Sequence, residues 1–425
     1  MEMNYQNYNN KFINNFVDID KECKYNKLFY KIGHLKRRVL NKKGENLQIN
    51  FINLILLFYI IINFLPISLS KKVISDLRKI NLYEEITIFI KGQGNQQILS
   101  NKFNINPDKV FENGIDKTSK YQNKKIYLNY PNSNVTLRWN SKLNTCEGMF
   151  QELSNIISID LSNFDSSNVI SIASMFYECF NLKYINFDNF VTSSVSKMQF
   201  MFCNCHSLIS LNLSNFNTQR VTNMGALFKG CFSLTSLDLS SFDTSLVTDL
   251  SYMFTFCKSL RYLDIHSFQT ISTTNIFLMF NNCNSLKTLD LSNFNTKSIV
   301  SMALLFENCY SLISINLSNF NTKLVTDMSK MFYNCSSLIS LDLSSFDISS
   351  LTNTENMLDG CNSLIFINLI SFEEKNDISN LIFNKISSDL IYCIDEIKAP
   401  TFNNAFKNNG LKNNCSNVCF LETKK

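Results

Sequence analysis

The sequence is poor in glycine, proline and histidine: its 425 residues include ten Gly, four Pro and three His. No proline lies between residues 132 and 399, so strands in this stretch lose no backbone donor to proline. There is no glycine-rich phosphate loop, and His34, His206 and His266 lie far apart in the sequence. Because no nucleophile, base and acid stand together, the sequence disfavours catalysis, and we expect a protein that is not an enzyme.

Basic charge is concentrated at the N-terminus. Residues 1–50 contain ten Lys or Arg against five Asp or Glu, which leaves thirty of each sign for residues 51–425. A nucleic-acid-binding protein needs a basic surface to neutralise phosphates, and the neutral remainder of the chain offers none. We therefore expect no nucleic-acid partner.

One apolar run stands out. FINLILLFYIIINFLPISL, residues 51–69, carries no charge and is close to the ~20 residues that cross a bilayer as a helix. The basic residues on either side slightly favour a cytosolic N-terminus. We interpret residues 51–70 as a transmembrane signal-anchor or as the core of a signal peptide cut after Ser70, with a buried strand or core helix as the alternative. The first two interpretations place the residues after about 70 outside the cytosol, at the cell surface or secreted.

A 26-residue repeat dominates residues 146–372. An apolar pair recurs at this interval in nine copies without an insertion, from Met149-Phe150 to Met357-Leu358. Such self-similarity predicts a solenoid, in which each unit stacks on its neighbours to bury one continuous core. A second row keeps the same interval and is predicted to fill that core: Phe164, Phe190, Phe216, Phe242, Phe268, Phe294, Phe320, Phe346 and Phe372.

The hydrophobic period changes within each unit. In VTDMSKMFYNC, residues 325–335, the apolar positions follow the i, i+3, i+4, i+7 spacing of a short amphipathic helix. Residues 338–346 then alternate between apolar and polar side chains, as in a short strand. We therefore predict an α/β solenoid: a leucine-rich-repeat-like stack of nine 26-residue coils, each with a short helix and a short parallel strand.

These motifs carry a resemblance to a known family. L-x-x-L-x-L-S-x-F-D/N-T, followed by M-x-x-M/L-F-x-x-C, resembles the BspA-type leucine-rich repeat, the 26-residue surface-protein repeat of bacteria and protists. The resemblance covers residues 146–372. It implies a curved solenoid on a secreted or cell-surface protein that adheres or binds a partner, with no catalytic residues and no cofactor.

The ends of the chain depart from the repeat. EITIFIKG, Gln97 to Phe103 and VTLRWN predict short strands, with turns at Asn113-Gly114 and Pro131-Asn132. We divide the chain into a basic cytosolic or leader segment (1–50), the apolar segment (51–70), a small β-rich N-terminal cap (71–145), the solenoid (146–372) and a cysteine-containing C-terminal cap or tail (373–425).

Eight cysteines recur with the coil and form what we call the cysteine ladder: Cys179, Cys205, Cys231, Cys257, Cys283, Cys309, Cys335 and Cys361. They lie on the predicted apolar stripe without a C-x-x-C pair, so we predict buried structural thiols, with disulfides or metal ligands as the alternatives. Cys393, Cys415 and Cys419 indicate a disulfide in the C-terminal cap, and the sequence leaves their pairing open.

A polar row on the strands is the predicted binding face: Asp160, Asn186, Asn212, Asp238, Asp264, Asp290, Asn316, Asp342 and Asn368. Asp238, Asp264 and Asp290 on adjacent strands would lie about 5 Å apart, and we expect these like charges to raise one another's pKa. Bound Ca²⁺ would relieve this repulsion. The alternative is that the Asp and Ser side chains of this face are solvated and cap turns. No resident metal is predicted.

Two coils carry larger side chains on this face. Tyr262 and His266 flank Asp264, while Tyr184 and Asp188 flank Asn186. Aromatic residues that also form hydrogen bonds are typical of protein-contact hot spots. The predicted binding residues are therefore Tyr184, Asp188, Asp238, Tyr262, Asp264, His266 and Asp290.

The sequence predicts recognition of a protein or glycan partner through a concave strand face, for adhesion. The alternative is a structural surface coat whose subunits pack side by side without a specific ligand. Sequons occur at Asn134, Asn212, Asn316, Asn334 and Asn414, and we expect Asn134 and Asn414 to be the glycan acceptors if the chain is a eukaryotic secreted protein.

Overall fold

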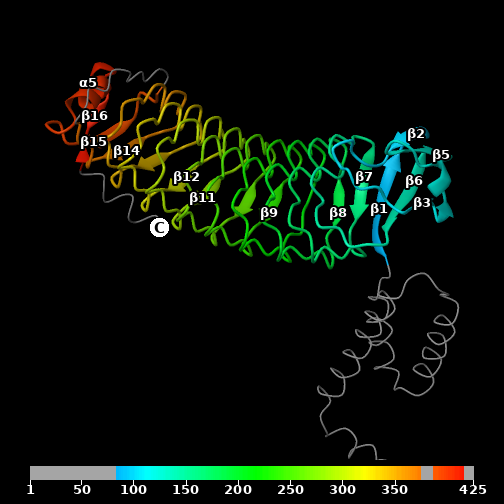
Figure 1. The fold of residues 1–425 in the computed structure, drawn as a ribbon. Coiled ribbons are helices and arrows are strands. Elements are labelled where there is room, and N and C mark those ends of the chain that lie inside the picture. Colours follow the sequence, from blue (N-terminus) through cyan, green and yellow to red (C-terminus); the bar gives the residue numbers. More distant parts are fainter. Residues whose placement is uncertain (1–82, 375–385, 416–425) are drawn as a thin grey trace, which may run out of the picture. The chain divides into compact units, whose positions relative to one another are not determined.

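A computed structural model describes residues 83–374 and 386–415 of the chain (Figure 1). The basic segment 1–50, the apolar segment 51–69 and Cys419 lie outside these residues. Among the helices of the described part, none has the length and apolar character of a membrane span. The membrane segment therefore stays a prediction.

The N-terminal cap is built mainly of antiparallel strands. β1 pairs along its whole length with β6, and β3 and β4 extend the same sheet, while β2 and β5 form a separate ribbon. The cap consists of β1 (Glu84–Lys91), β2 (Gly94–Gln97), β3 (Lys109–Glu112), β4 (Ile115–Asp116), the 3₁₀ turn η1 (Thr118–Lys120), β5 (Lys125–Leu128) and β6 (Asn132–Trp139). Alternate residues of β1 and β6 are buried, because one face of these strands packs in the hydrophobic core.

Two of the three expected cap strands are confirmed, as is the expected Asn113-Gly114 turn. That turn joins β3 to β4, and both residues adopt positive φ, 49° and 84°. The strand expected from Gln97 to Phe103 is wrong, because β2 ends at Gln97 and the chain turns again where Phe103 N–H donates to the Ser100 carbonyl.

The cap sheet continues into the solenoid. Its six strands follow the order β4-β3-β6-β1-β7-β8, where β7 (Ile156–Asp160) and β8 (Tyr184–Asn186) belong to the first two coils. β1 is antiparallel to β7, whereas β7 is parallel to β8. Cap and coils therefore share one hydrogen-bonded surface.

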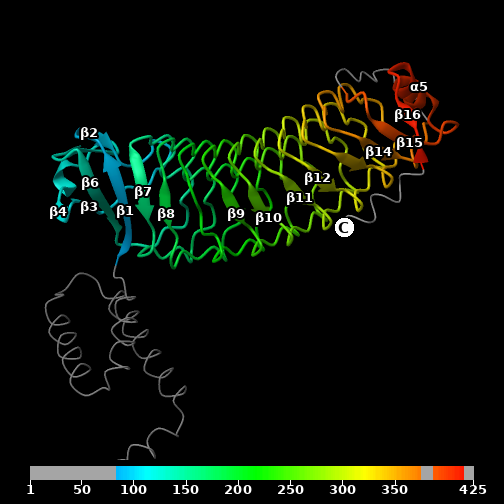
Figure 2. The same ribbon diagram turned by 180° about the vertical axis from the view of Figure 1, so that it is seen from behind.

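The other seven of the nine repeats form further coils. Figures 1 and 2 show the stack from opposite sides. The strands of these coils are β9 (Ser236–Asp238), β10 (Tyr262–Asp264), β11 (Thr288–Asp290), β12 (Ser314–Asn316), β13 (Ser340–Asp342) and β14 (Phe366–Leu369). Parallel pairing joins β9 to β10, β11 to β12 and β13 to β14. One strand per coil is predicted, but in the described chain the third coil has no strand at the equivalent residues 210–212.

The predicted helix in each coil is wrong, and three overlapping β-turns take its place. In the eighth coil, the N–H groups of Met331, Tyr333 and Cys335 donate to the carbonyls of Met328, Lys330 and Phe332, three residues back rather than four. Residues Lys330 and Asn334 adopt left-handed φ angles of 54° and 59°. Turns of this kind also bury the i, i+3, i+4 and i+7 positions, so the apolar spacing does not distinguish them from a helix. The fold is thus a β-solenoid.

Backbone hydrogen bonds join the turns of successive coils. Lys330 N–H donates to the Glu355 carbonyl at 2.8 Å and Phe332 N–H donates to the Met357 carbonyl at 3.0 Å, one coil further on. The alternate N–H groups that a helix would use internally therefore hold neighbouring coils together.

The core lies between the turns and the strands. One aromatic row, from Phe150 to Phe332, stacks ring on ring with centroids 5.4 to 6.0 Å apart. The second row, from Phe164 to Phe372, is buried beside it, as expected. Each coil thus adds one layer of the same side chains to a continuous core.

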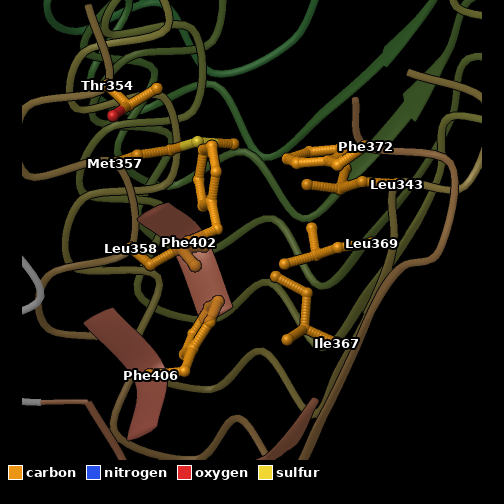
Figure 3. A pocket seen from close by; sticks show the side chains of 9 residues that line it. All are labelled: Leu343, Thr354, Met357, Leu358, Ile367, Leu369, Phe372, Phe402 and Phe406. Atoms are coloured by element: carbon orange, nitrogen blue, oxygen red, sulfur yellow. The ribbon is translucent and has the colours of Figure 1, made fainter. Parts of the chain in front are cut away.

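A C-terminal cap closes the other end. It comprises β15 (Ile391–Ile394), α5 (Pro400–Asn408) and β16 (Lys412–Asn413), with β15 parallel to β14. Phe402 and Phe406 of α5 are buried and line a small apolar cavity at the ninth coil (Figure 3). Its volume of about 10 Å³ is at the lower limit for a single water, so it is a packing defect rather than a ligand site.

Candidate functional site on the strand face

The polar row on the strands has a structural role in every coil. At each of its nine positions, the side-chain oxygen Oδ1 accepts a hydrogen bond from the backbone N–H two residues later. Asp238, for example, accepts from Ser240 N–H at 2.9 Å. This Asx turn directs the chain out of the strand, which explains why the row alternates only between Asp and Asn.

The expected mutual rise in carboxylate pKa is wrong for two of the three aspartates. Hydrogen bonds from Ser240 lower the pKa of Asp238, and the hydrogen bond with His266 is the main cause that lowers the pKa of Asp264. Repulsion between Asp238 and Asp264 acts in the opposite direction, but these donors outweigh it. Both groups are therefore carboxylates at neutral pH.

Three predicted binding residues come together in the fifth coil and form what we call the central patch: Tyr262, Asp264 and His266. Tyr262 Oη donates to Asp264 Oδ2 at 3.4 Å, and His266 Nδ1 lies 2.6 Å from Asp264 Oδ1. Tyr262 is 59% exposed, whereas the Asp264 side chain between the two rings is only 21% exposed. The carboxylate thus holds two exposed rings in place on a rigid strand.

Charge reinforces this arrangement. The carboxylate of Asp264 raises the pKa of Tyr262, so the phenol keeps its proton and remains a hydrogen-bond donor. Asp238 lies directly opposite Asp264 on the paired strand β9. The central patch therefore presents two rings beside a pair of carboxylates.

The remaining predicted residues are distributed more widely. Asp290 lies at the end of β11, in the next coil, and its carboxylate accepts from Ser292 N–H at 2.9 Å. Tyr184 and Asp188 lie in the second coil, three coils from the central patch, and Asp188 N–H donates to Asn186 Oδ1. The binding residues thus form two separate places on the strand face.

The second place is an open groove of about 790 Å³ where the cap meets the first two coils, which we call the cap groove. Its floor spans the adjacent strands β6, β1, β7 and β8. The strand register places its side chains in two rows of four. One row is Asn134, Phe89, Ser158 and Tyr184, and the other is Thr136, Thr87, Asp160 and Asn186.

The hairpin turn between β3 and β4 lines the groove together with this floor. Asn113 Oδ1 accepts a hydrogen bond from Asn134 N–H at 3.0 Å, and Asn113 N–H donates to the Asn134 carbonyl at 2.8 Å. These two bonds fix the turn against β6. The walls and floor of the groove are consequently preformed.

The eight thiols of the cysteine ladder are buried and unpaired. Each Sγ–H donates to the carbonyl of the phenylalanine 29 residues earlier, at 3.0 to 3.2 Å. Burial raises the pKa of these thiols, to about 12 for Cys257 and Cys309. In the C-terminal cap, Cys393 is disulfide-bonded to Cys415. Within the described ranges, no three His, Cys, Asp or Glu side chains are arranged to hold a metal ion.

Sequence reasoning missed the part of the cap groove that the cap contributes. Tyr184, Asp160 and Asn186 were predicted on the binding face, but Thr87, Phe89, Asn134 and Thr136 were not. The alternation within each strand indicates which side chains share a face. It does not reveal that β1 lies between β6 and β7, because this pairing joins segments far apart in the sequence.

The repeat also identifies relatives of the chain. The model of one protein family, described as Mycoplasma protein of unknown function, DUF285, matches residues 118–210, 173–288, 206–311 and 257–372. Together these matches cover residues 118–372, which is more than half of the 425 residues. The chain belongs to this DUF285 family. A comparison with curated proteins finds no match. The DUF285 matches extend over the whole solenoid and part of the N-terminal cap, and they carry no statement of function.

Proposed function

We propose that this DUF285 chain is a cell-surface or secreted solenoid of the BspA type that recognises a protein or glycan partner through its strand face. The observation that carries the proposal is the central patch. Tyr262 in β10 and His266 in the turn that follows it are two large ring side chains at positions where the neighbouring coils carry Ser and Thr, and Asp264 restrains both. Exposed rings that are already held in place lose little conformational entropy on binding, which is what a contact hot spot requires.

The rest of the molecule supports recognition rather than catalysis. The aspartates of the polar row each cap a turn, and the buried thiols are protonated and inaccessible. A rigid stack with varied side chains at a few exposed positions is suited to binding.

Binding by the full chain tests the proposal. We expect the double variant Tyr262→Ala, His266→Ala to reduce the binding of fluorescently labelled protein to target cells at least tenfold. The matched control is Ser340→Ala, Ser344→Ala, which changes the equivalent positions three coils later and should bind like the unaltered chain. Equal binding by both double variants would overturn the proposed role of the central patch.

The location is tested separately. A membrane-impermeant amine reagent applied to intact cells that produce the chain should modify Lys183 and Lys287, which are exposed beside strands β8 and β11. Modification only after the cells are lysed would contradict a surface location.

A structural coat is the second candidate, and one observation favours it. Ile313, Ile339 and Ile365 occupy the same position in three consecutive coils and are all exposed. This apolar stripe would suit side-by-side packing of solenoids. Light scattering that gives a monomer mass over a wide concentration range would exclude it.

A further inference from the structure

We propose that the cap groove is a binding site for a neutral oligosaccharide. This inference rests on the proposed recognition function and names the ligand class of a second place on the strand face. It follows from the shape of the groove, from the chemistry of its two rows of side chains and from the absence of cationic groups among them.

The size of the groove fits a short oligosaccharide. Its volume of about 790 Å³ lies within the range of small-molecule sites. Its floor is four strands wide, or ~14 Å between the outer strands at the usual strand spacing. The hairpin turn at Asn113-Gly114 lines it as well, and a side-chain Cβ at Gly114 would meet no atom within 4 Å, so a ligand has space there.

The first row alternates rings with polar side chains. Phe89 lies opposite both Asn134 and Ser158, and Ser158 lies opposite Tyr184. The two rings are therefore two strands apart, ~10 Å, and Tyr184 is 53% exposed. A pyranose ring has an apolar C–H face that packs on an aromatic ring, and rings at this spacing can support two sugar units of one chain.

The second row supplies hydrogen bonds. Thr87 Oγ1 and Thr136 Oγ1 lie 3.0 Å apart, and Asn186 Nδ2 donates to Asp160 Oδ1 at 3.1 Å. Each hydroxyl retains further donor or acceptor capacity after one such bond. Because these groups hold one another in position, they can contact the hydroxyl edge of a sugar without reorganising.

The charge of the groove selects among ligands. None of the side chains that line it in the described chain is basic, and Asp160 is the one carboxylate among them. A phosphate, a sulfated glycan or a nucleic acid would find no cation there. An extended peptide that adds as a strand is also disfavoured over most of the floor, because β6, β1 and β7 are each paired on both edges and only β8 ends the sheet. Of the ligand classes considered, a neutral, hydroxyl-rich ligand with apolar faces fits the groove best.

Calorimetry on the full chain tests the inference. The chain is made in bacteria so that Asn134 carries no glycan, and it is titrated with neutral di- and trisaccharides of glucose, galactose and N-acetylglucosamine. A sulfated disaccharide serves as the anionic comparison. We expect at least one neutral sugar to bind and the sulfated one not to bind.

Variants locate the site. Tyr184→Ala should weaken sugar binding at least tenfold, while Tyr184→Phe keeps the ring and should retain most of it. Tyr127→Ala, at an exposed tyrosine of β5 that does not line the groove, should leave sugar binding unchanged. The absence of binding by every neutral sugar, tighter binding of the sulfated sugar, or equal affinity of Tyr184→Ala and the unaltered chain would each overturn the inference. Displacement of the sugar by a polar peptide that binds more tightly would assign the groove to a peptide instead.

The two proposals fail in different ways. If cell binding depends on Tyr262 but no sugar binds, the glycan inference is wrong and the recognition function stands. If sugar binding depends on Tyr184 but cell binding is unchanged by substitutions in the central patch and in the cap groove, the groove is a sugar site and the central patch is not the cell-binding site.

Discussion

The hydroxyl of Thr244 joins two coils through a single residue, Gln269. Thr244 Oγ1 donates to the Gln269 carbonyl at 3.1 Å and accepts from the Gln269 N–H at 2.8 Å. Thr244 is fully buried, and the same pair of bonds recurs at Thr192, Thr218, Thr270 and Thr296. Ile348 replaces the repeating Thr in the eighth of the nine coils.

Thr244→Val should therefore destabilise the solenoid by about 2–4 kcal/mol. The substitution keeps the side-chain shape but leaves both backbone groups of Gln269 without their partner, and an unmet polar group costs about 1–3 kcal/mol where it is buried. Hydrogen exchange followed by mass spectrometry should show faster exchange at the Gln269 amide. Thr244→Ser keeps the hydroxyl and is the control. Equal exchange in the Val and Ser variants would contradict the role of the hydroxyl.

Thr354→Val should have the opposite effect and stabilise the chain by about 1 kcal/mol. Thr354 occupies the position that holds an apolar residue in the eight preceding coils, such as Met328. Its buried Oγ1 has no hydrogen-bond partner among the described residues and lies beside the small cavity under α5 (Figure 3). Replacing an unsatisfied hydroxyl by a methyl group removes its desolvation penalty.

Urea denaturation measures this effect, and Thr322→Val is the matched control. Thr322 is also buried, but its Oγ1 donates to the Asp347 carbonyl at 2.9 Å, so its replacement should destabilise the chain. If both variants shift the urea midpoint in the same direction, then the presence of a hydrogen bond to the hydroxyl does not determine whether its replacement stabilises or destabilises the chain.

The sequence was sufficient to predict the stack and its core, but not the local backbone. The 26-residue interval correctly places the Met-Phe pair, the cysteine ladder and the second phenylalanine row in one core. The helix was wrong because Met328, Met331, Phe332 and Cys335 have a helical spacing that a run of tight turns also produces. The distinguishing signal is the residue at each left-handed position, where Asn or Gly often stands, as at Asn334 and Gly360.

The candidate site was predictable only where it lies within one coil. Tyr262 and Asp264 lie two residues apart in β10, so their alignment on one face follows from the strand period, and His266 follows in the Asx turn that ends this strand. The cap groove depends on β1 entering between β6 and β7, which short-range patterns cannot specify. The pKa of Asp238 was misjudged because strand spacing reveals the neighbouring charge but not the N–H donor from the following turn.

Lys330→Gly should stabilise the chain by about 0.5–1 kcal/mol, despite the loss of a side chain. Lys330 adopts a φ of 54°, a left-handed conformation that costs a residue with a Cβ about 1–2 kcal/mol, whereas glycine adopts it freely. The greater entropy of glycine in the unfolded chain offsets part of this gain. Thermal unfolding checks the prediction. Ser329→Gly, at the preceding residue with an ordinary φ, should destabilise the chain, and stabilisation by both would argue against left-handed strain as the cause.

Because of the cysteine ladder, the free energy of unfolding of the chain should fall as the pH rises through the alkaline range. Burial raises the pKa of Cys309 from its ordinary value of 9.0 to about 12. Above pH 9 the unfolded thiol loses its proton while the folded thiol keeps it, so the folded state binds more protons and its stability falls as pH rises, until the folded pKa is reached. Each such thiol contributes a loss of about 1.4 kcal/mol per pH unit in this window.

Cys309→Ala isolates this contribution. At pH 7 the variant should be less stable than the unaltered chain, because it leaves a cavity in the core and removes the hydrogen bond to the Phe280 carbonyl. From pH 9 to pH 11 the difference in unfolding free energy, measured by urea denaturation, should shrink by about 1.4 kcal/mol per pH unit, since the variant has one thiol fewer to ionise. Met302→Ala, a buried site without a titratable group, should show a constant difference over the same range. A Cys309→Ala difference that is equally constant would mean that the thiol ionises as readily in the folded chain as in the unfolded one.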